Sequence, residues 1–172
     1  SLLPGMAFGW SCAAGDLNGD GYPDLAVTTT YGEFVQVYLG SAHGVAPTAI
    51  EVPCPGKNAM DVCIGDWNGD GRGDLVVSHW YPGKLSVLLA KEDGTFTIEA
   101  IPIVYPGSVA CADFDADGKT DLAVLVGESS DDGLDYAVQI FHGLGDGHFS
   151  RGDAYDVGAT QGSNVTVIVL RR

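Results

Sequence analysis

The stretch that decides the fold is GDLNGDGYPDLAV, residues 15–27, where acidic or amide side chains occupy alternate positions ahead of an apolar run. Taken alone, it fits either a polar turn between two strands or a metal-binding loop. The pattern returns as GDWNGDGRGDLVV at 65–77 and as ADFDADGKTDLAV at 112–124. The first aspartates of the copies stand 50 and 47 residues apart, so the chain is built from a repeated unit.

The sequence around each copy predicts four short strands. A short apolar segment precedes the motif, and the motif itself ends in an apolar run. An alternating segment and a hairpin turn come next, with the alternating segments reading FVQVYLG from Phe34, KLSVLLA from Lys84 and YAVQIFHG from Tyr136. Four antiparallel strands at a period of roughly 40–50 residues describe one blade of a β-propeller.

We therefore predict an all-β fold, with one propeller domain over residues 1–172 that contains three four-stranded antiparallel blades and one extra strand. The predicted blades cover about 8–53, 58–104 and 107–158, and the extra strand covers about 162–172. Three blades are few for a closed ring. The sequence thus predicts either a piece of a longer propeller or copies that together complete a ring or a polymer. The segment 165–170 could pair with the sheet edge of a neighbouring molecule.

The composition agrees with a glycine-rich β protein and argues against several partners. The 172 residues include 25 glycines and 8 prolines, 45% are hydrophobic, and the net charge is −15. This negative charge argues against binding to nucleic acid and to anionic membrane surfaces. No apolar stretch approaches the roughly 18 residues of a membrane-spanning helix, so we expect no membrane insertion.

The spacing of the oxygen-bearing side chains predicts a calcium loop in each copy. Calcium takes roughly six to eight oxygen ligands, and a tight loop can aim the side chains at positions 1, 3 and 5 at one centre. Glycine at position 6 permits the turn, position 7 offers its backbone carbonyl, and the acid at position 9 closes the shell. The predicted ligands are Asp16, Asn18, Asp20, Tyr22 and Asp24; Asp66, Asn68, Asp70, Arg72 and Asp74; and Asp113, Asp115, Asp117, Lys119 and Asp121.

Polar β-turns are the alternative interpretation of these loops, because Asn-Gly and Asp-Gly are common in turns. Three copies with the same spacing favour a metal, since several carboxylates packed into one turn repel each other unless a cation is present. A set of oxygen ligands selects against zinc and copper. Position 12 is Val27, Val77 or Val124 rather than glutamate, which excludes an EF-hand. We therefore predict three Ca²⁺ sites.

The three motifs resemble those of the FG-GAP/VCBS family, whose repeats form the blades of integrin-α-like β-propellers. The resemblance is carried by DLNGDGYPDLAV, DWNGDGRGDLVV and DFDADGKTDLAV, together with the later hairpins VLLAKEDGTF and HGLGDGHF. It implies that each acidic loop joins the first two strands of a blade and holds calcium. It also implies a secreted or cell-surface location and a role in binding or adhesion.

Some segments depart from the repeat or suggest other roles. Blade three carries an insertion, GESSDDGLD at 127–135, which we expect to form an exposed loop that is variable or binds a partner. The chain after Gly162 has no acidic motif. The RGD tripeptide at 72–74 lies inside a predicted calcium loop and cannot present its aspartate. We attribute the second, at 151–153, to chance.

The signals for catalysis are weak, and we expect no enzyme activity. Neither a GxSxG elbow nor an HExxH motif occurs. The four histidines are scattered through predicted hairpins and strand ends, namely His43, His79, His142 and His148. We expect His142 and His148 to be solvated, with a meeting across a hairpin as the alternative. No catalytic residue and no cofactor other than calcium is predicted.

Two functional classes remain. The first is a calcium-stabilised extracellular module for binding, adhesion or self-assembly, whose partner is an unknown protein, a glycan or another copy. The second is an accessory propeller, such as a carbohydrate-binding one, of a larger secreted enzyme. The aromatic residues Trp10, Trp80 and Tyr81 could stack on a sugar, although packing between blades is the preferred interpretation.

The four cysteines include no CxxC pair, so we expect no zinc cluster. Cys54 and Cys63 are close enough in sequence to pair across a turn. The preferred interpretation is that Cys12, Cys63 and Cys111 are small buried hydrophobic residues in equivalent strands.

Overall fold

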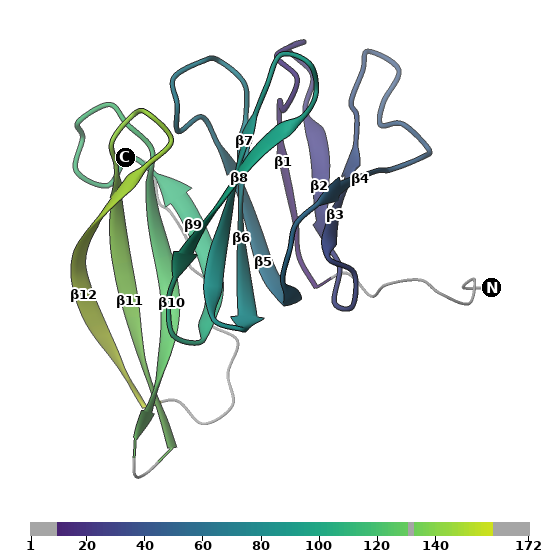
Figure 1. Ribbon diagram of the computed structural model, residues 1–172. Coiled ribbons are helices and arrows are strands. Elements are labelled where there is room, and N and C mark those ends of the chain that lie inside the picture. Colours follow the sequence, from purple (N-terminus) through teal and green to yellow (C-terminus); the bar gives the residue numbers. More distant parts are fainter. Residues whose placement is uncertain (1–9, 131–132, 160–172) are drawn as a thin grey trace.

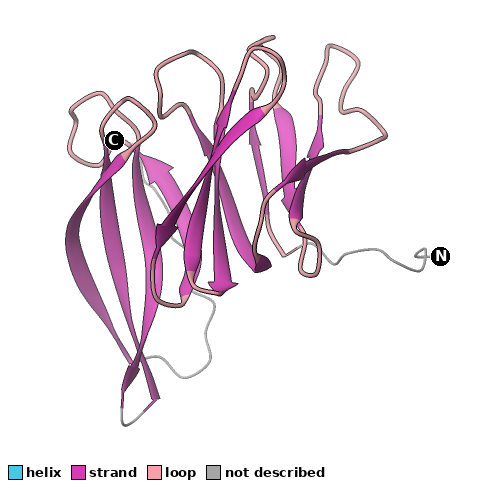
Figure 2. Cartoon of the chain, in the orientation of Figure 1, coloured by secondary structure: helices cyan, strands magenta, loops and turns pink. Residues whose placement is uncertain are grey.

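The fold consists of three antiparallel sheets that stand side by side like blades (Figures 1 and 2). The computed structural model describes residues 10–130 and 133–159, and within them every regular element is a strand. The strands of the first sheet are β1 (Cys12–Gly15), β2 (Asp24–Thr28), β3 (Phe34–Tyr38) and β4 (Ile50–Pro53). Those of the second are β5 (Lys57–Gly65), β6 (Asp74–Tyr81), β7 (Lys84–Ala90) and β8 (Phe96–Pro102). Those of the third are β9 (Pro106–Ala112), β10 (Asp121–Ser130), β11 (Gly133–Gly143) and β12 (Phe149–Ala159).

Each sheet is a simple up-and-down meander, in which neighbours in the sequence are neighbours in the sheet. The acidic motif always joins the first strand to the second, because its last aspartate begins the second strand. Asp24, Asp74 and Asp121 pair with Gly15, Gly65 and Ala112 at the end of the preceding strand. The predicted all-β class and the three four-stranded blades are therefore confirmed. The predicted extra strand at 162–172 lies outside the described residues.

The hydrophobic core is divided into two layers, one between each pair of neighbouring blades. The central strand β6 supplies both layers, since successive side chains of a strand point to opposite faces. Leu75 and Val77 belong to the layer shared with the first blade, whereas Val76 belongs to the layer shared with the third. This explains why DLVV reads as a continuous apolar run: the middle blade is covered on both faces.

Glycines let neighbouring blades approach closely. The Gly73 amide donates a hydrogen bond of 2.7 Å to the Asp16 carbonyl of the preceding loop. A Cβ at Gly73 would lie 2.8 Å from that carbonyl oxygen and 2.7 Å from the Ile64 side chain, which is too close for both. The Gly147 amide makes a similar bond of 2.9 Å to the Trp67 carbonyl, so the loops help to join the blades.

The insertion in the third blade is a continuation of the sheet rather than the exposed loop that the sequence predicts. The pairing of β10 with β11 runs through Glu128 with Asp135 to Ser130 with Gly133. The hairpin extends beyond the blade body in Figure 1. The extra residues lie on both sides of the turn, so they lengthen the ladder of hydrogen bonds instead of interrupting it.

The two outer faces of the array are uncovered in the described part of the chain. The residue after the first aspartate of the motif shows this most clearly. In the first two blades this residue packs in the layer shared with the next blade. Leu17 and Trp67 are 5% and 1% exposed, whereas Phe114 in the last blade is 40% exposed. The third blade therefore presents an apolar face that its equivalents bury against a neighbour.

Candidate calcium loops

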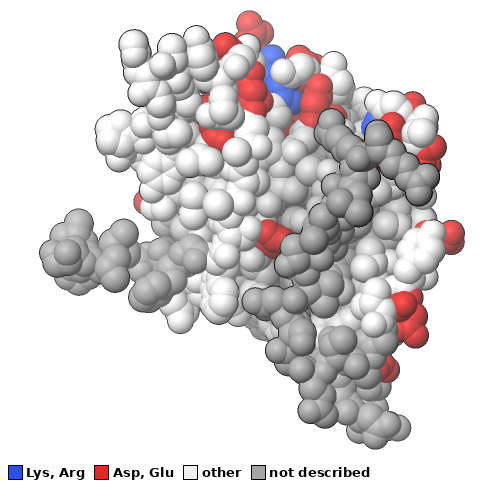
Figure 3. All heavy atoms as spheres, turned by 180° about the vertical axis from the view of Figure 1, so that it is seen from behind, with Lys and Arg blue, Asp and Glu red and all other residues white. Residues whose placement is uncertain are grey.

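The three acidic loops lie at one end of the blades, over the ends of their first strands. Seen from behind in Figure 3, Asp and Glu side chains gather at this end, with a few Lys and Arg atoms among them. The chain thus places the predicted ligand groups along one rim of the molecule. Because the repeat is regular, the three loops can be compared position by position.

The aspartate at position 1 organises each turn by accepting backbone amides. Asp16 accepts hydrogen bonds from the amides of Gly19, Asp20 and Gly21 at 2.7, 3.1 and 2.7 Å. Asp66 makes the same three contacts, and Asp113 makes the last two. The turn needs left-handed backbone at position 6, where φ is 83–87° and every copy has glycine. The carboxylate and the glycine together shape the loop.

Positions 3 and 5 bring further oxygens to the same turn. In the first loop the Asp20 amide donates to Asn18 Oδ1 at 2.9 Å, and the Tyr22 amide donates to Asp20 Oδ1 at 2.8 Å. The second loop repeats both bonds with Asn68, Asp70 and Arg72. The backbone amides of the turn therefore hold these side chains in place by themselves.

The third loop is the most acidic, because it has Asp115 where the first two have asparagine. Carboxylate oxygens of Asp113, Asp115 and Asp117 all lie within 4.8 Å of one another. Such a group is repulsive on its own and matches the donor set of a hard cation. The residues present fit calcium at positions 1, 3 and 5.

The aspartate at position 9 has a different environment from the other predicted ligands. Asp24, Asp74 and Asp121 are at most 1% exposed. Asp24 accepts the Leu17 amide at 2.9 Å and the Gly40 amide at 2.7 Å, so it joins the loop to the end of β3. Asp74 and Asp121 make the equivalent pairs of bonds in their blades. The sequence pattern did not predict this bracing role, although the position of the aspartate at the start of a buried strand is a usable signal.

Burial and hydrogen bonding act in opposite directions on the braced carboxylate of the middle blade. Burial raises the pKa of Asp74 to about 6, while hydrogen bonds from the Ala90 and Trp67 amides oppose the rise. The neighbouring charges of Asp70 and Asp66 raise the pKa further. A carboxylate oxygen has two lone pairs, so accepting one amide leaves each oxygen able to meet a cation.

The side chain at position 7 pairs with an acid of its own loop in two of the three copies. Arg72 Nη2 lies 2.6 Å from Asp70 Oδ2, and Lys119 Nζ lies 3.2 Å from Asp117 Oδ2. The hydrogen bond from the Lys119 amide lowers the pKa of Asp117, and the bond from the Lys119 side chain lowers it further. The first loop has Tyr22 at this position and no such cation. The loops therefore differ in how much of their negative charge a side chain already offsets.

A histidine that the sequence pattern did not predict as part of a site joins the third loop. His142 Nδ1 lies 3.2 Å from Asp115 Oδ2 and 3.9 Å from Asp121 Oδ1. It stands one residue before the strand end that Asp121 braces, where the first two blades have Leu39 and Leu89. His148 lies elsewhere, with its ring nitrogens 3.7 Å from Glu99 and 3.3 Å from Asp146. His142 and His148 therefore contact different sets of carboxylates.

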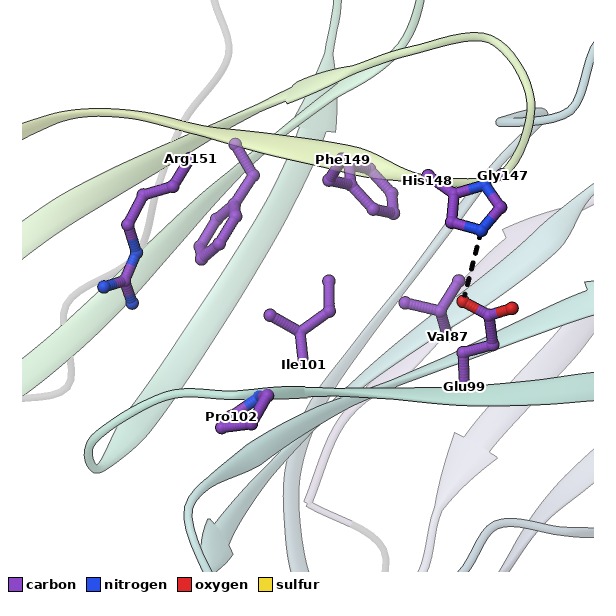
Figure 4. A pocket seen from close by; sticks show the side chains of 9 residues that line it. Val87, Glu99, Ile101, Pro102, Gly147, His148, Phe149 and Arg151 are labelled. Carbon is purple, nitrogen blue, oxygen red and sulfur yellow. Dashed lines mark ion pairs between the residues drawn. The ribbon is translucent and has the colours of Figure 1, made fainter.

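His148 and Glu99 border a groove of about 260 Å³ between β8 and β12 (Figure 4). Ile101, Phe149 and Val87 form much of its wall, and the His148–Glu99 pair closes one end. Arg151 lies at the other end, with its guanidinium carbon 5.6 Å from the centre of the Phe141 ring. The arginine of the second RGD tripeptide therefore packs on an aromatic ring. In the first tripeptide Asp74 is fully buried, so it cannot present its carboxylate to a partner.

The predicted aromatic residues form a hollow at the opposite end of the blades from the acidic loops. Trp10 and Trp80 line a hollow of about 240 Å³ together with Thr30, Asn58 and Met60. Trp10 is 65% exposed, and the Trp80 ring lies 5.2 Å from that of Tyr105. Tyr81 is exposed and does not line the hollow. Trp10 and Tyr81 are therefore exposed, whereas Trp80 is half-buried and packs against Tyr105 beside the third blade.

All four cysteines carry free thiols, and they occupy different environments. Cys54 is buried with its Sγ 3.5 Å from His79 Nε2, so it is not paired with Cys63. Cys12 is exposed, and the expectation that it is a buried hydrophobic residue is wrong. The reason is that its equivalents, Val62 and Val109, face a preceding blade, which Cys12 lacks in the described chain.

The fold and the loops define a propeller protein with repeated acidic turns. A family model for the FG-GAP-like repeat matches residues 16–77 and again 66–124, which together make up more than half of the chain. The chain belongs to the FG-GAP-like repeat family. Both matches begin at the first aspartate of an acidic loop.

The comparison with solved structures adds a distant likeness. A crystal structure of a protein from Lactobacillus plantarum aligns with a TM-score of 0.46 and 10% sequence identity, over 85% of this chain. The aligned part is 41% of that protein, so this chain spans about two fifths of its length. No curated protein matches this sequence. Among the described residues there is also no helix of the length and apolar character needed to cross a membrane.

Proposed function

We propose that the three acidic loops bind calcium in a structural role, and that the chain is an extracellular propeller module for binding, adhesion or self-assembly. The observation that carries the proposal is the convergence of the Asp113, Asp115 and Asp117 carboxylates within 4.8 Å. The same loop, with the same backbone bonds to its first carboxylate, recurs in the first two blades. Repulsion within each loop gives a cation a reason to be there.

The residues at positions 1, 3 and 5 would hold the ion, with the carbonyl at position 7 and the carboxylate at position 9 beside them. When bound, calcium would neutralise the loop and tie the first strand of each blade to the second. Extracellular modules bind calcium at about 10⁻⁴–10⁻³ M, a range in which sites fill outside a cell and stay empty in the cytosol. FG-GAP-like repeats are typical of extracellular proteins, which supports the same location.

We assign no enzymatic activity to this chain. The groove in Figure 4 is mainly apolar and holds one histidine–glutamate pair, without a nucleophile beside the histidine. His79, the histidine with the closest thiol and hydroxyl neighbours, is 1% exposed and out of reach of a substrate.

Calorimetric titration and thermal melting test the calcium proposal. With three sites each at 100-fold excess over Kd, linkage stabilises the fold by about 2.7 kcal/mol per site, so EDTA should lower Tm markedly. Asp117→Asn should remove one site from the titration. Asp93→Asn, in an exposed hairpin outside the motif, is the matched control and should keep all three. Identical melting in calcium and in EDTA contradicts the proposal.

The aromatic hollow supports a second candidate function, that of a carbohydrate-binding accessory module. Two tryptophans with Asn58 and Thr30 between them combine stacking surfaces with hydrogen-bonding groups, as sugar sites require. A glycan array separates the candidates, because binding should be lost in Trp10→Ala or Trp80→Ala and should survive Tyr31→Ala, which changes another exposed aromatic.

A further inference from the structure

Two cysteines face each other across the boundary between the second and third blades. Cys63 lies on β5 opposite Val76 of β6, and Cys111 lies on β9 opposite Leu122 of β10. Val76 and Leu122 both belong to the core layer between these blades. Cys63 is buried within that layer and Cys111 packs against it, so the side chains enter it from opposite sides. The strands β5 and β9 are themselves in contact.

The contacts of Cys111 place its thiol beside the strand that carries Cys63. Cys111 Sγ donates a hydrogen bond of 3.1 Å to the carbonyl of Ile64, the residue next to Cys63. The two thiols are also within interaction range of each other. Cys63 is 6% exposed, whereas Cys111 is partly exposed, so Cys111 is the thiol that a reagent in solvent reaches more readily.

The thiol pair is not required by the repeat. At the corresponding places between the first and second blades stand Ala13 and Ile64, which carry no thiol. The other two cysteines have different surroundings. Cys54 contacts His79, and burial raises its pKa to about 11. Cys12 is exposed on the first blade, on the face that points away from the second.

We propose that Cys63 and Cys111 form a disulfide that joins the second blade to the third when the protein meets an oxidising environment. Cys111, as the thiolate, attacks one sulfur of a low-molecular-weight disulfide, forms a mixed disulfide and expels one thiolate. Cys63 then loses its proton to solvent, attacks Cys111 Sγ and expels the second thiolate. Two protein thiols are oxidised, and one small disulfide is reduced to two thiols. The bond would close a loop that contains one whole acidic motif.

Peptide mapping of the full chain tests the proposal. The protein is equilibrated with an excess of oxidised over reduced glutathione, alkylated, digested without reductant and analysed by mass spectrometry. We expect a cross-linked peptide that contains Cys63 and Cys111, with Cys12 and Cys54 alkylated. Oxidation should also raise Tm by about 5 °C or more, because the bond constrains the unfolded chain.

Two variants sharpen the result. Cys12→Ser should keep the cross-link and the rise in Tm, whereas Cys111→Ser should lose both. If Cys111→Ser does not fold, the peptide map of the unmodified protein still decides. Four alkylated cysteines after oxidation, or a cross-link through Cys54, would overturn the proposal. Repeating the peptide map in calcium and in EDTA tests the disulfide independently of whether the loops bind calcium.

Discussion

His79 shows how much a single residue depends on what packs around it. In the sequence it is one of four scattered histidines, yet in the middle blade it is 1% exposed. Its Nε2 lies 3.0 Å from Ser86 Oγ and 3.5 Å from Cys54 Sγ. Gly56, with φ of 144°, lies against the ring where a Cβ would be 2.6 Å from Nδ1. Burial, and then the charge of Lys84, lower the pKa of His79 to about 4.

This burial predicts a pH dependence of stability. The unfolded chain protonates this histidine near 6.5 and the folded chain near 4, so between these values the unfolded state binds more protons. Stability should therefore fall as pH drops from 6.5 to 4, by about 3 kcal/mol from this group. Urea unfolding in EDTA measures it as the difference between the wild type and His79→Gln. The exposed His148→Gln is the control, and identical pH profiles for wild type and His79→Gln would contradict the prediction.

At the scale of the element, the acidic loop combines two devices. One is the exposed turn, whose oxygens surround the proposed ion. The other is the buried aspartate at position 9, which ties the start of the loop to the end of the third strand. Trp67 and Ala90 donate amides to Asp74 at 3.1 and 2.8 Å in the middle blade. The second device belongs to the protein alone and should work without a metal.

The two devices can be separated by substitution in EDTA. Asp74→Ala leaves two buried amides without an acceptor, and we expect it to cost about 3 kcal/mol of unfolding free energy. Asp70→Ala, in the exposed part of the same loop, should cost within about 1 kcal/mol under the same conditions. Denaturant unfolding measures both. Equal costs would contradict the bracing role and return Asp74 to the role of a ligand only.

At the scale of the whole molecule, the burial of an apolar residue depends on whether its face of the blade packs against another blade. Trp67 inserts between the second and third blades, where its ring meets that of Phe149 at a centroid distance of 5.9 Å. Phe114 holds the equivalent place on the third blade and is 40% exposed. Tyr155 and Val157 on β12 add to the apolar surface of this blade. A surface of this kind is typical of a site that another blade or another chain covers.

This difference predicts opposite effects for equivalent residues. Trp67→Ala should cost about 4 kcal/mol of stability, because it opens a cavity between two packed blades. Phe114→Ala should leave the stability of the single chain nearly unchanged. If copies assemble through this face, Phe114→Ala should lower the mean mass measured by light scattering. A wild-type protein that stays at 17.9 kDa at all concentrations would contradict self-assembly.

The sequence by itself determined the repeat, the strands and the shape of the acidic loops, because these depend on local rules. Alternating apolar residues specify strands, and an aspartate that accepts the amides of its own turn needs only the few residues after it. The tertiary structure alone decided the rest. The exposure of Cys12, the burial of His79, the approach of His142 to the third loop and the facing thiols of Cys63 and Cys111 all depend on which blade faces which. Residues about 50 positions apart become neighbours only when the blades pack, and no short-range pattern in the chain records that contact.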